Sequence, residues 1–202
     1  MIHAKIAGRL ARHAGLRLFR LFSRPLERRP GAVPAGLGLR LLSLPEVLDL
    51  CSDPGLDLRR DAAAAAYARG DLCVAAFDAD AVAGYCWLAF APLPHLDGVW
   101  VRFDRRVAWT YKSLVLPSYR GKGIAPALYR FSDADSRERG CSDSVICVES
   151  HNRPSISAAL RAGYAPSGYG AYVFRGSRLL TCSSAAAKRH AVSFFLPQAG
   201  LG

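Results

Sequence analysis

The sequence predicts an α/β (α+β) fold, in which a mixed sheet carries helices on both of its faces. Two observations predict it. Apolar runs of strand length alternate with helical patterns through residues 37–175. One of these runs, residues 108–116, passes through a tight turn rich in Gly and cationic residues into a helix that begins near Ile124. The resulting order is strand, two helices, hairpin, strand, helix, strand, helix and final strands.

The predicted strands are short apolar segments bounded by turn residues. Residues 72–77 and 81–90 form a hairpin around Asp78-Ala79-Asp80, and residues 144–149 are almost continuously apolar, as a buried parallel strand is. Further strands are predicted at residues 37–42, 108–116, 164–167 and 171–174, and residues 192–196 add one more apolar segment of strand length.

The predicted helices have recognisable starts and stops. Ser43 and Glu46 have the spacing of a capping box, which opens a helix that runs to about Cys51. A second helix, residues 58–69, contains a run of Ala and ends at Gly70, where a glycine is favoured. The remaining helices are predicted at residues 124–138 and 154–162.

Length and composition allow one domain of ordinary size with extensions. The chain has 202 residues, 51% of them hydrophobic, and a net charge of +11. Residues 1–29 hold eight Lys/Arg and one acid, Glu27, so they contribute +7 and leave +4 for the remainder. Basicity concentrated in an arm gives little support to a nucleic-acid-binding core. We expect a basic arm and linker (1–36), a folded domain (37–175) and a C-terminal extension (176–202).

The arm itself, residues 1–29, predicts a helix that stops near Pro25. Arginine recurs every three to five residues, which excludes a bilayer-spanning segment. No apolar stretch of signal-peptide length is present. The acid-poor, Arg-rich composition suits peripheral contact with an anionic membrane or an acidic protein, and a loosely docked extension is an equally good interpretation.

The chain contains six cysteines, and they point to a reducing compartment. No C-x-x-C pair exists, and no His lies at metal-ligand spacing from any of them. A cysteine inside an apolar run behaves as a small hydrophobic residue. We therefore predict reduced thiols in a cytoplasmic protein, and no metal site.

The turn after residues 108–116 has the chemistry of an anion site. Gly121 and Gly123 can adopt backbone angles that are closed to other residues, and they let a ligand approach the main chain. The first turn of the following helix offers unpaired N–H groups and the positive end of the dipole, and Arg120 and Lys122 add two charges. Phosphate is the usual guest of such a site. Neither the nucleotide-hydrolase phosphate loop nor the dinucleotide fingerprint G-x-G-x-x-G is present.

The same turn carries a family resemblance. Arg120, Gly123 and Ala125 form the pattern Arg-x-x-Gly-x-Ala, preceded by Val-x-Pro at Val115 and Pro117. This resembles the acyl-CoA-binding signature of the GNAT (GCN5-related N-acetyltransferase) superfamily. A second similar segment runs through residues 149–164. The resemblance covers residues 37–175 and implies a mixed, mostly antiparallel sheet that is splayed at its centre, where the pantetheine arm of CoA lies.

The resemblance implies acetyl-CoA, or another acyl-CoA, as the acyl donor. Backbone N–H groups of residues 120–125 are then expected to hold the pyrophosphate, and the exposed strand edge is expected to bind the pantetheine amides. A main-chain N–H near Val115 or Leu116 would polarise the thioester carbonyl. Asn152 faces the pantetheine, caps the helix, or does both. The expected cofactor-binding residues are Leu114, Val115, Leu116, Arg120, Gly121, Lys122, Gly123, Ile124, Ala125, Asn152 and Ser155.

The acid and the base are less well defined. Many family members have a Tyr five residues before the final aromatic of the second segment, where it protonates the departing thiolate, but here that residue is Ala159. Tyr164, Tyr119 or a water molecule are the substitutes, unless no acid is needed. For the base that deprotonates the amine, the candidates are Glu149 at a strand end, Tyr111, and His95 and Asp97 in a long loop.

The acceptor wall is expected in the loop of residues 95–106, with His95, Asp97 and Trp100 as substrate-contacting residues. The function implied is transfer of an acetyl group to a primary amine of a small molecule or amino acid. Three alternatives remain. They are a long-chain N-acyl amino acid synthase-like enzyme that uses an acyl carrier protein, a catalytically silent CoA-binding module, and a protein that binds nucleic acid through its arm.

Overall fold

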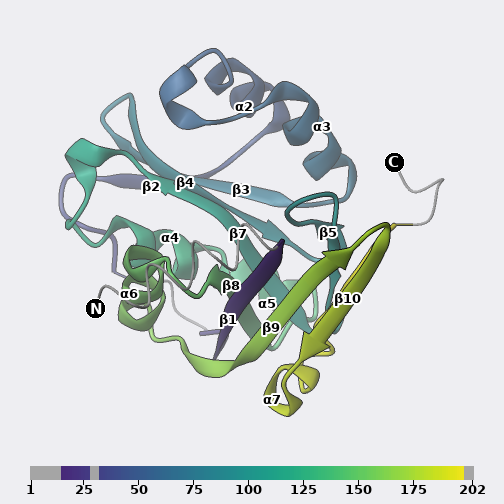
Figure 1. Cartoon of the computed structure of the whole chain (residues 1–202). Helices are drawn as coiled ribbons and strands as arrows, with labels where there is room; N and C mark the ends of the chain where they lie inside the picture. Colours follow the sequence, from purple (N-terminus) through teal and green to yellow (C-terminus); the bar gives the residue numbers. More distant parts are fainter. Residues whose placement is uncertain (1–14, 28–31, 198–202) are drawn as a thin grey trace.

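The computed structural model describes residues 15–27 and 32–197. An eight-stranded sheet has the order β10-β9-β1-β8-β7-β4-β3-β2, and a small three-stranded sheet has the order β11-β6-β5 (Figure 1). The strands are β1 (Leu16–Pro25), β2 (Gly38–Leu42), β3 (Leu72–Asp78), β4 (Ala81–Ala89), β5 (Leu93–Pro94), β6 (Trp100–Arg102), β7 (Val107–Val115), β8 (Asp143–Glu149), β9 (Ala165–Arg175), β10 (Arg178–Ser183) and β11 (Ser193–Phe195).

Helices cover both faces of the large sheet, as predicted (Figure 1). Strand β3 shows why, because its alternate residues are buried on opposite sides: Val74 packs in a core with α4 and α6, whereas Cys73 packs in a core with α2 and α3. A strand buried on both faces has an unbroken apolar sequence. The helices are α2 (Leu44–Leu50), α3 (Arg60–Ala68), α4 (Ile124–Phe131), α5 (Asp133–Glu138), α6 (Arg153–Arg161) and α7 (Ala185–Lys188), with 3-10 turns at Pro54–Leu56 and Pro117–Tyr119.

The predicted splay at the centre of the sheet is confirmed. Strands β7 and β8 are the parallel pair among otherwise antiparallel neighbours. Their pairing covers Val107 to Thr110 of β7 and Asp143 to Ile146 of β8. Beyond these residues the two strands continue without pairing, so a gap opens toward their carboxyl ends.

The helix predicted over residues 1–29 is wrong where the structure describes it. Residues 16–25 form β1, which lies between β8 and β9 and pairs antiparallel with both (Figure 1). Phe19 and Leu21 pack on one side of the sheet and Phe22 on the other. The regularly spaced arginines hid this alternation in the sequence. The segment forms a strand because β8 and β9 each offer an edge to pair with, and this pairing overrides the helical pattern. Residues 1–14 lie outside the described residues.

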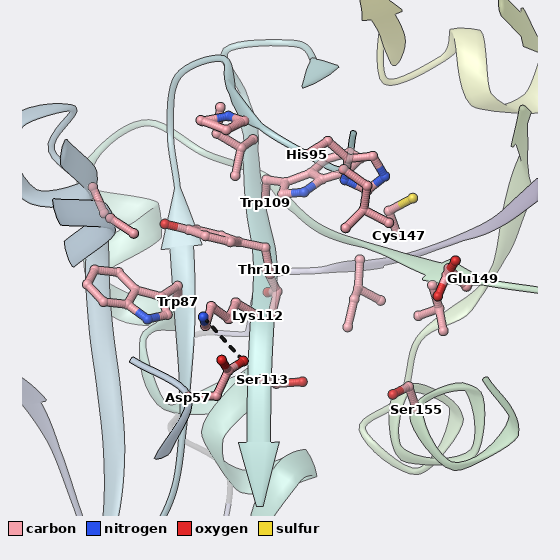
Figure 2. Close-up of a pocket in the computed structure, with 18 of the residues that line it drawn as sticks. Asp57, Trp87, His95, Trp109, Thr110, Lys112, Ser113, Cys147, Glu149 and Ser155 are labelled. Carbon is pink, nitrogen blue, oxygen red and sulfur yellow. Dashed lines mark ion pairs between the residues drawn. The ribbon is translucent and has the colours of Figure 1, made fainter. Parts of the chain in front are cut away.

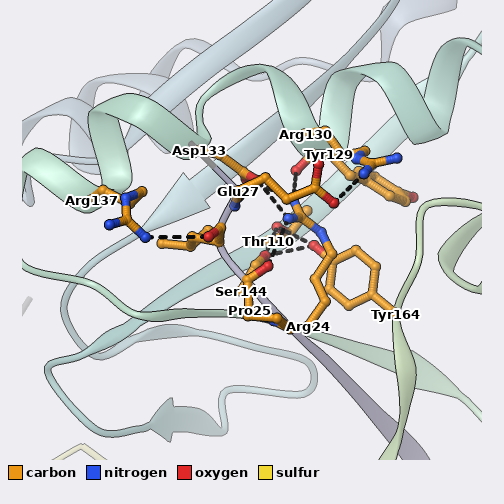
Figure 3. A network of polar contacts seen from close by, with 11 residues as sticks. Arg24, Pro25, Glu27, Thr110, Tyr129, Arg130, Asp133, Arg137, Ser144 and Tyr164 are labelled. Atoms are coloured by element: carbon orange, nitrogen blue, oxygen red, sulfur yellow. Dashed lines mark hydrogen bonds and ion pairs between the residues drawn. The ribbon is translucent and has the colours of Figure 1, made fainter. Parts of the chain in front are cut away.

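A buried charge pair holds β1 against the helices. The Arg24 guanidinium donates to both carboxylate oxygens of Asp133, at 2.5 and 2.7 Å, and also to the backbone carbonyl of Tyr129 (Figure 3). Both charged side chains are only 2% exposed. Removing one member of such a pair leaves a buried charge without a partner, which typically lowers the stability of the fold by about 3–5 kcal/mol. The pair therefore fixes β1 to the start of α5.

Other predicted elements differ mainly at their ends. The capping box of Ser43 and Glu46 is present at α2. The helix predicted at residues 124–138 is two helices, because the backbone leaves the helical region at Ser132. The two strands predicted at 164–167 and 171–174 are one strand, β9, and the apolar segment at 192–196 contains β11. Among the described residues, no helix has the length and hydropathy needed to span a bilayer.

Candidate active site

Two cavities meet where β7 separates from β8. The first, called here the α4 cavity, has a volume of about 520 Å³ and is bounded by the end of β7, the turn before α4 and the first turns of α4 and α6. The second, the α3 cavity, has a volume of about 590 Å³ and lies between α3, the middle of β7 and the end of β8. Ser113, Asn152 and Ser155 line both cavities. Figure 2 shows Glu149 and Ser155 across the gap from Ser113.

Main-chain groups form much of the α4 cavity. Gly121 and Gly123 have φ angles of +82° and +78°, and a Cβ built on either would meet no atom within 4 Å. Within the described chain, no carbonyl accepts from the N–H groups of Gly121, Lys122 or Gly123. These donors lie at the amino terminus of α4, where the helix dipole favours an anion. The groups present therefore fit a pyrophosphate.

The cations that flank this turn are partly engaged. Arg120 donates from Nε to the Val115 carbonyl at 3.2 Å, and the Lys122 ammonium lies 5.0 Å from the centre of the Tyr119 ring. Both charges remain at the exposed edge of the cavity. They would add to the backbone donors around a bound phosphate.

A β-bulge lies in β7 where the strand leaves β8. Tyr85 of β4 pairs with Leu114 and Trp87 pairs with Tyr111, so β7 has one residue more than its partner over this interval. Lys112 within the bulge has φ of 40°. A bulge leaves main-chain groups unpaired and reorients the strand. Here it lies at the junction of the two cavities.

The two main-chain N–H groups that were expected to polarise the carbonyl, those of Val115 and Leu116, point in different directions. The Leu116 N–H donates to the Ala83 carbonyl of β4 at 3.0 Å, so it is already paired. Main-chain groups of successive strand residues point to opposite sides. The Val115 N–H therefore points away from β4, toward the open gap.

Tyr164 and Ala159 do not face either cavity. The Tyr164 hydroxyl lies 2.6 Å from the Ser144 hydroxyl and 3.4 Å from that of Thr110, in a fully buried network (Figure 3). Ala159 is 0% exposed within the core between α6 and the sheet. The expected role of Tyr164 as a substitute acid therefore has no support from its position.

Tyr129 was missed by sequence reasoning and lies at the junction. It lines the α4 cavity from α4, and its hydroxyl is 2.8 Å from that of Ser113. Burial raises the pKa of Tyr129, so the hydroxyl keeps its proton at neutral pH. A buried tyrosine hydroxyl requires a hydrogen-bond partner. The sequence offered one signal of such a pair, the polar Ser113 at the end of an otherwise apolar strand.

Among the candidate bases, Glu149 lies in the best position. It lines the α3 cavity at the end of β8. One carboxylate oxygen accepts from Arg17 at 3.2 Å, and the other lies 3.7 Å from the His151 imidazole. Arg17 also forms a two-point ion pair with Asp97 at 2.8 and 3.1 Å. Arg17 was not predicted as a site residue, because residues 1–29 were interpreted as an arm.

Tyr111 and His95 line the same cavity, but neither is suited to act as the base at neutral pH. The Tyr111 hydroxyl donates to Asp71 at 2.7 Å, and burial together with that carboxylate raises the pKa of Tyr111 far above neutrality. Burial lowers the pKa of His95 to about 4. The His95 ring packs against Phe19 with a centroid distance of 4.7 Å. His95 is thus a neutral wall residue of the cavity at pH 7.

The two other predicted substrate contacts are not in the cavity wall. The Asp97 carboxylate pairs with Arg17, which also pairs with the cavity-lining Glu149. The backbone φ angle of Asp97 is 57°. Trp100 belongs to β6, where its ring lies 6.5 Å from that of Phe195. The walls consist mainly of apolar and aromatic groups, including Phe19, Leu58, Trp87, Leu93 and Trp109.

Comparisons with known proteins agree with this geometry. The model of the acetyltransferase (GNAT) family matches residues 41–164. A GCN5-related N-acetyltransferase from Sphaerobacter thermophilus has a TM-score of 0.53 at 18% identity, over 89% of this chain and 56% of that one. A tandem GNAT protein from the clavulanic acid biosynthesis pathway has a TM-score of 0.53 at 17% identity, over 88% and 58%. This chain thus spans little more than half the length of those two proteins.

A third solved structure is of more similar length. AAC(6')-Iy, in complex with the bisubstrate analogue CoA-S-monomethyl-acetylneamine, has a TM-score of 0.51 at 16% identity, over 64% of this chain and 90% of that one. No curated protein matches the sequence. At these identities the structural likeness shows the fold alone, whereas the family model matches more than half of the chain. The chain belongs to the acetyltransferase (GNAT) family.

Proposed function

We propose that this protein transfers an acetyl group from acetyl-CoA to a primary amine of a small molecule. The observation that carries the proposal is the meeting of the two cavities at Ser113, Asn152 and Ser155, beside the bulge of β7. One cavity has the backbone donors that a pyrophosphate requires, and the other has room for an acceptor. A relative with this fold, AAC(6')-Iy, was solved with an analogue that joins CoA to an acetylated acceptor.

The donor site uses main-chain groups in two places. The N–H groups of residues 121–123 and the first turn of α4 hold the pyrophosphate. Asn152 caps α6 by accepting from the Ser155 N–H at 3.2 Å, and its amide nitrogen remains available to the pantetheine arm. Acetyl-CoA supplies an acyl group on a thioester, whose thiolate is a good leaving group.

The α3 cavity supplies the base. Glu149 accepts the proton of the acceptor ammonium. Asp57 and Glu149 are the carboxylates that line this cavity, and Glu149 is the one at the end of β8, beside the gap, whereas Asp57 pairs with Lys112. Arg17 and His151 orient its two oxygens. The freed nitrogen lone pair then reaches the carbonyl carbon, while the Val115 N–H stabilises the developing oxyanion. A donor of that kind is typically worth about 3 kcal/mol of the barrier.

Tyr129 supplies the acid. Its hydroxyl gives a proton to the departing thiolate, either directly or through Ser113, as the carbon–sulfur bond breaks. This assignment replaces the expected Tyr164. Unlike Tyr164, Tyr129 lines the α4 cavity, and its hydroxyl reaches Ser113, which lines both cavities.

The test has two parts. Acetyl-CoA at millimolar concentration is expected to raise the melting temperature, since a ligand that binds the folded state stabilises it. Release of free thiol is then measured against a panel of primary amines, and acetylated product is identified by mass. Stabilisation without turnover would support a silent CoA-binding module, and preference for a long acyl donor would support the carrier-protein alternative. Absence of stabilisation would contradict the proposal.

A further inference from the structure

One face of the sheet around β1, β9 and β10 carries side chains that no other part of the described chain covers. The register pairs Arg20 with Tyr169, Leu180 with Val173, and Arg178 with Arg175. Since residues paired across antiparallel strands point to the same side, these side chains share one face. We call it the outer face, and define it by its exposed members Leu18, Arg20, Tyr169, Arg175, Arg178 and Leu180.

The outer face is apolar as well as basic. Leu18 is 49% exposed, Tyr169 57% and Leu180 50%, although each lies in a strand of the large sheet. The opposite side of the same strands packs in a closed core that includes Phe19 and Tyr172. A sheet with one solvated face normally alternates apolar and polar residues. Exposed leucines in the polar positions therefore mark a contact surface.

The charge of this region has one sign. No Asp or Glu follows Glu149 in the sequence, whereas residues 150–202 hold six Lys/Arg. Among the described residues, Arg20, Arg175 and Arg178 form no ion pair. The Arg20 guanidinium lies 5.9 Å from the centre of the Tyr169 ring. The strand pairing of β1 with β9 thus brings the basic residues of two distant sequence regions together.

Charge selects the class of partner. A second copy of the chain would place these arginines against the same arginines, and juxtaposed like charges are unfavourable. The chain's own residues 1–14 are also basic, with Lys5, Arg9 and Arg12 and no acid. The partner must therefore be anionic. The leucines distinguish between anions, because phosphates of nucleic acid are contacted by cationic and polar groups and not by leucine, whereas an interfacial protein surface combines cations with leucine and aromatic groups.

We propose that the outer face docks on an anionic lipid surface. The arginines reach the headgroups with their long stems lying on apolar surface, Tyr169 sits at the interface, and Leu18 and Leu180 enter the acyl boundary. Each Lys or Arg near an anionic leaflet contributes about five-fold to binding. None of the residues that define the outer face lines either cavity of the active site, so docking leaves the cavities open.

Sedimentation with vesicles tests the charge. Wild type is expected to bind vesicles of phosphatidylcholine with about one third phosphatidylglycerol, and not pure phosphatidylcholine. The triple variant Arg20→Gln, Arg175→Gln, Arg178→Gln is expected to bind about 100-fold more weakly. The matched control removes three exposed arginines elsewhere, Arg60→Gln, Arg105→Gln, Arg106→Gln, and is expected to bind nearly as wild type. No binding to anionic vesicles, or equal loss in both triple variants, would overturn the proposal.

The leucines distinguish lipid from nucleic acid. The double variant Leu18→Asn, Leu180→Asn is expected to lose about ten-fold in vesicle binding, because apolar burial is removed while charge is kept. Its weak, salt-sensitive binding to a random DNA duplex is expected to stay unchanged. Vesicle binding unaffected by the leucine changes, or DNA binding tighter than vesicle binding at the same salt, would assign the face to nucleic acid and overturn the lipid assignment. Melting temperatures of all variants confirm that each is folded.

Discussion

The two cavities that meet at the centre of the sheet are built differently. The α4 cavity depends on main-chain N–H groups within one short segment, the turn of residues 120–125 and the helix start that follows. The α3 cavity depends on side chains from β1, α3, β4, β7, β8 and the loop after β4. The proposed acyl donor, a ligand common to many proteins, would be held by main-chain groups, and a single local sequence pattern encodes these. An acceptor particular to one protein is held by side chains that only the complete fold brings together.

The largest expected effect is at the α3 cavity. Glu149→Gln removes the proposed base and is expected to lower the turnover rate about 1,000-fold at neutral pH. The loss is expected to shrink as the pH rises above the pKa of the acceptor amine, because a neutral amine needs no base. Initial rates across a pH series measure this.

Asp97→Asn is the matched control for that prediction, since Arg17 binds both carboxylates. It is expected to retain most of the activity. If the two variants lose activity equally and without pH dependence, the carboxylates act only through the placement of Arg17.

At the α4 cavity, Gly123→Val places a branched side chain at a positive φ in the anion site. Acetyl-CoA binding is expected to weaken about 100-fold, because the main-chain donors are displaced and occluded. The strain also lowers stability by roughly 1–2 kcal/mol. Calorimetry measures the affinity and thermal melting measures the stability.

Gly140→Val separates these effects. Gly140 has φ of +84° and equally open surroundings, but it follows α5 and lines neither cavity. The Gly140→Val variant is expected to lose as much stability as Gly123→Val, with unchanged acetyl-CoA affinity. Normal affinity in Gly123→Val would contradict a backbone-built donor site.

The junction of the cavities is tested by Tyr129→Phe. Removal of the hydroxyl is expected to lower the turnover rate about ten-fold, with acetyl-CoA affinity unchanged, because the proton donor acts only as the thiolate departs. Tyr164→Phe removes an equally buried hydroxyl that contacts Ser144 and Thr110. It is expected to cost about 1 kcal/mol of stability and no activity. The reverse pattern would return the acid role to Tyr164.

At the α3 cavity, the stability of the fold is expected to depend on pH. Burial lowers the pKa of His95 from 6.5 to about 4. Between these values the unfolded chain binds a proton that the folded chain does not, so the stabilisation is complete above pH 6.5 and is lost as the pH falls toward 4. The loss amounts to at most about 3 kcal/mol. Melting temperatures of wild type and His95→Phe from pH 7 to 4.5 measure it, and equal slopes would show that His95 does not cause the loss.

The predictability of the site follows the same division. Gly121, Gly123 and the start of the following helix were sufficient to predict a pyrophosphate-compatible turn, because local backbone chemistry determines it. The splay of the sheet was predicted only through the family resemblance. The base was one of four candidates, since only the fold shows that Tyr111 is paired with Asp71 and that His95 is buried. The acid was left open between Tyr164, Tyr119 and a water molecule, and only the fold shows that Tyr164 faces the core. Strand β1 was missed because Phe19, Leu21 and Phe22 are buried on opposite sides of the sheet only once β1 is paired between β8 and β9. The sequence alone does not show that pairing.

The placement of β1 has a consequence for synthesis of the chain. Arg17 and Glu149, which end up in contact, are separated by 132 positions in the sequence. During translation β1 leaves the ribosome long before β8 and β9 exist, so its two edges stay unpaired while the intervening residues are made. Contacts of such long sequence separation form late and slowly, and an unpaired apolar strand is prone to aggregate in the interval. We expect the nascent protein to depend on chaperones until its last strands emerge.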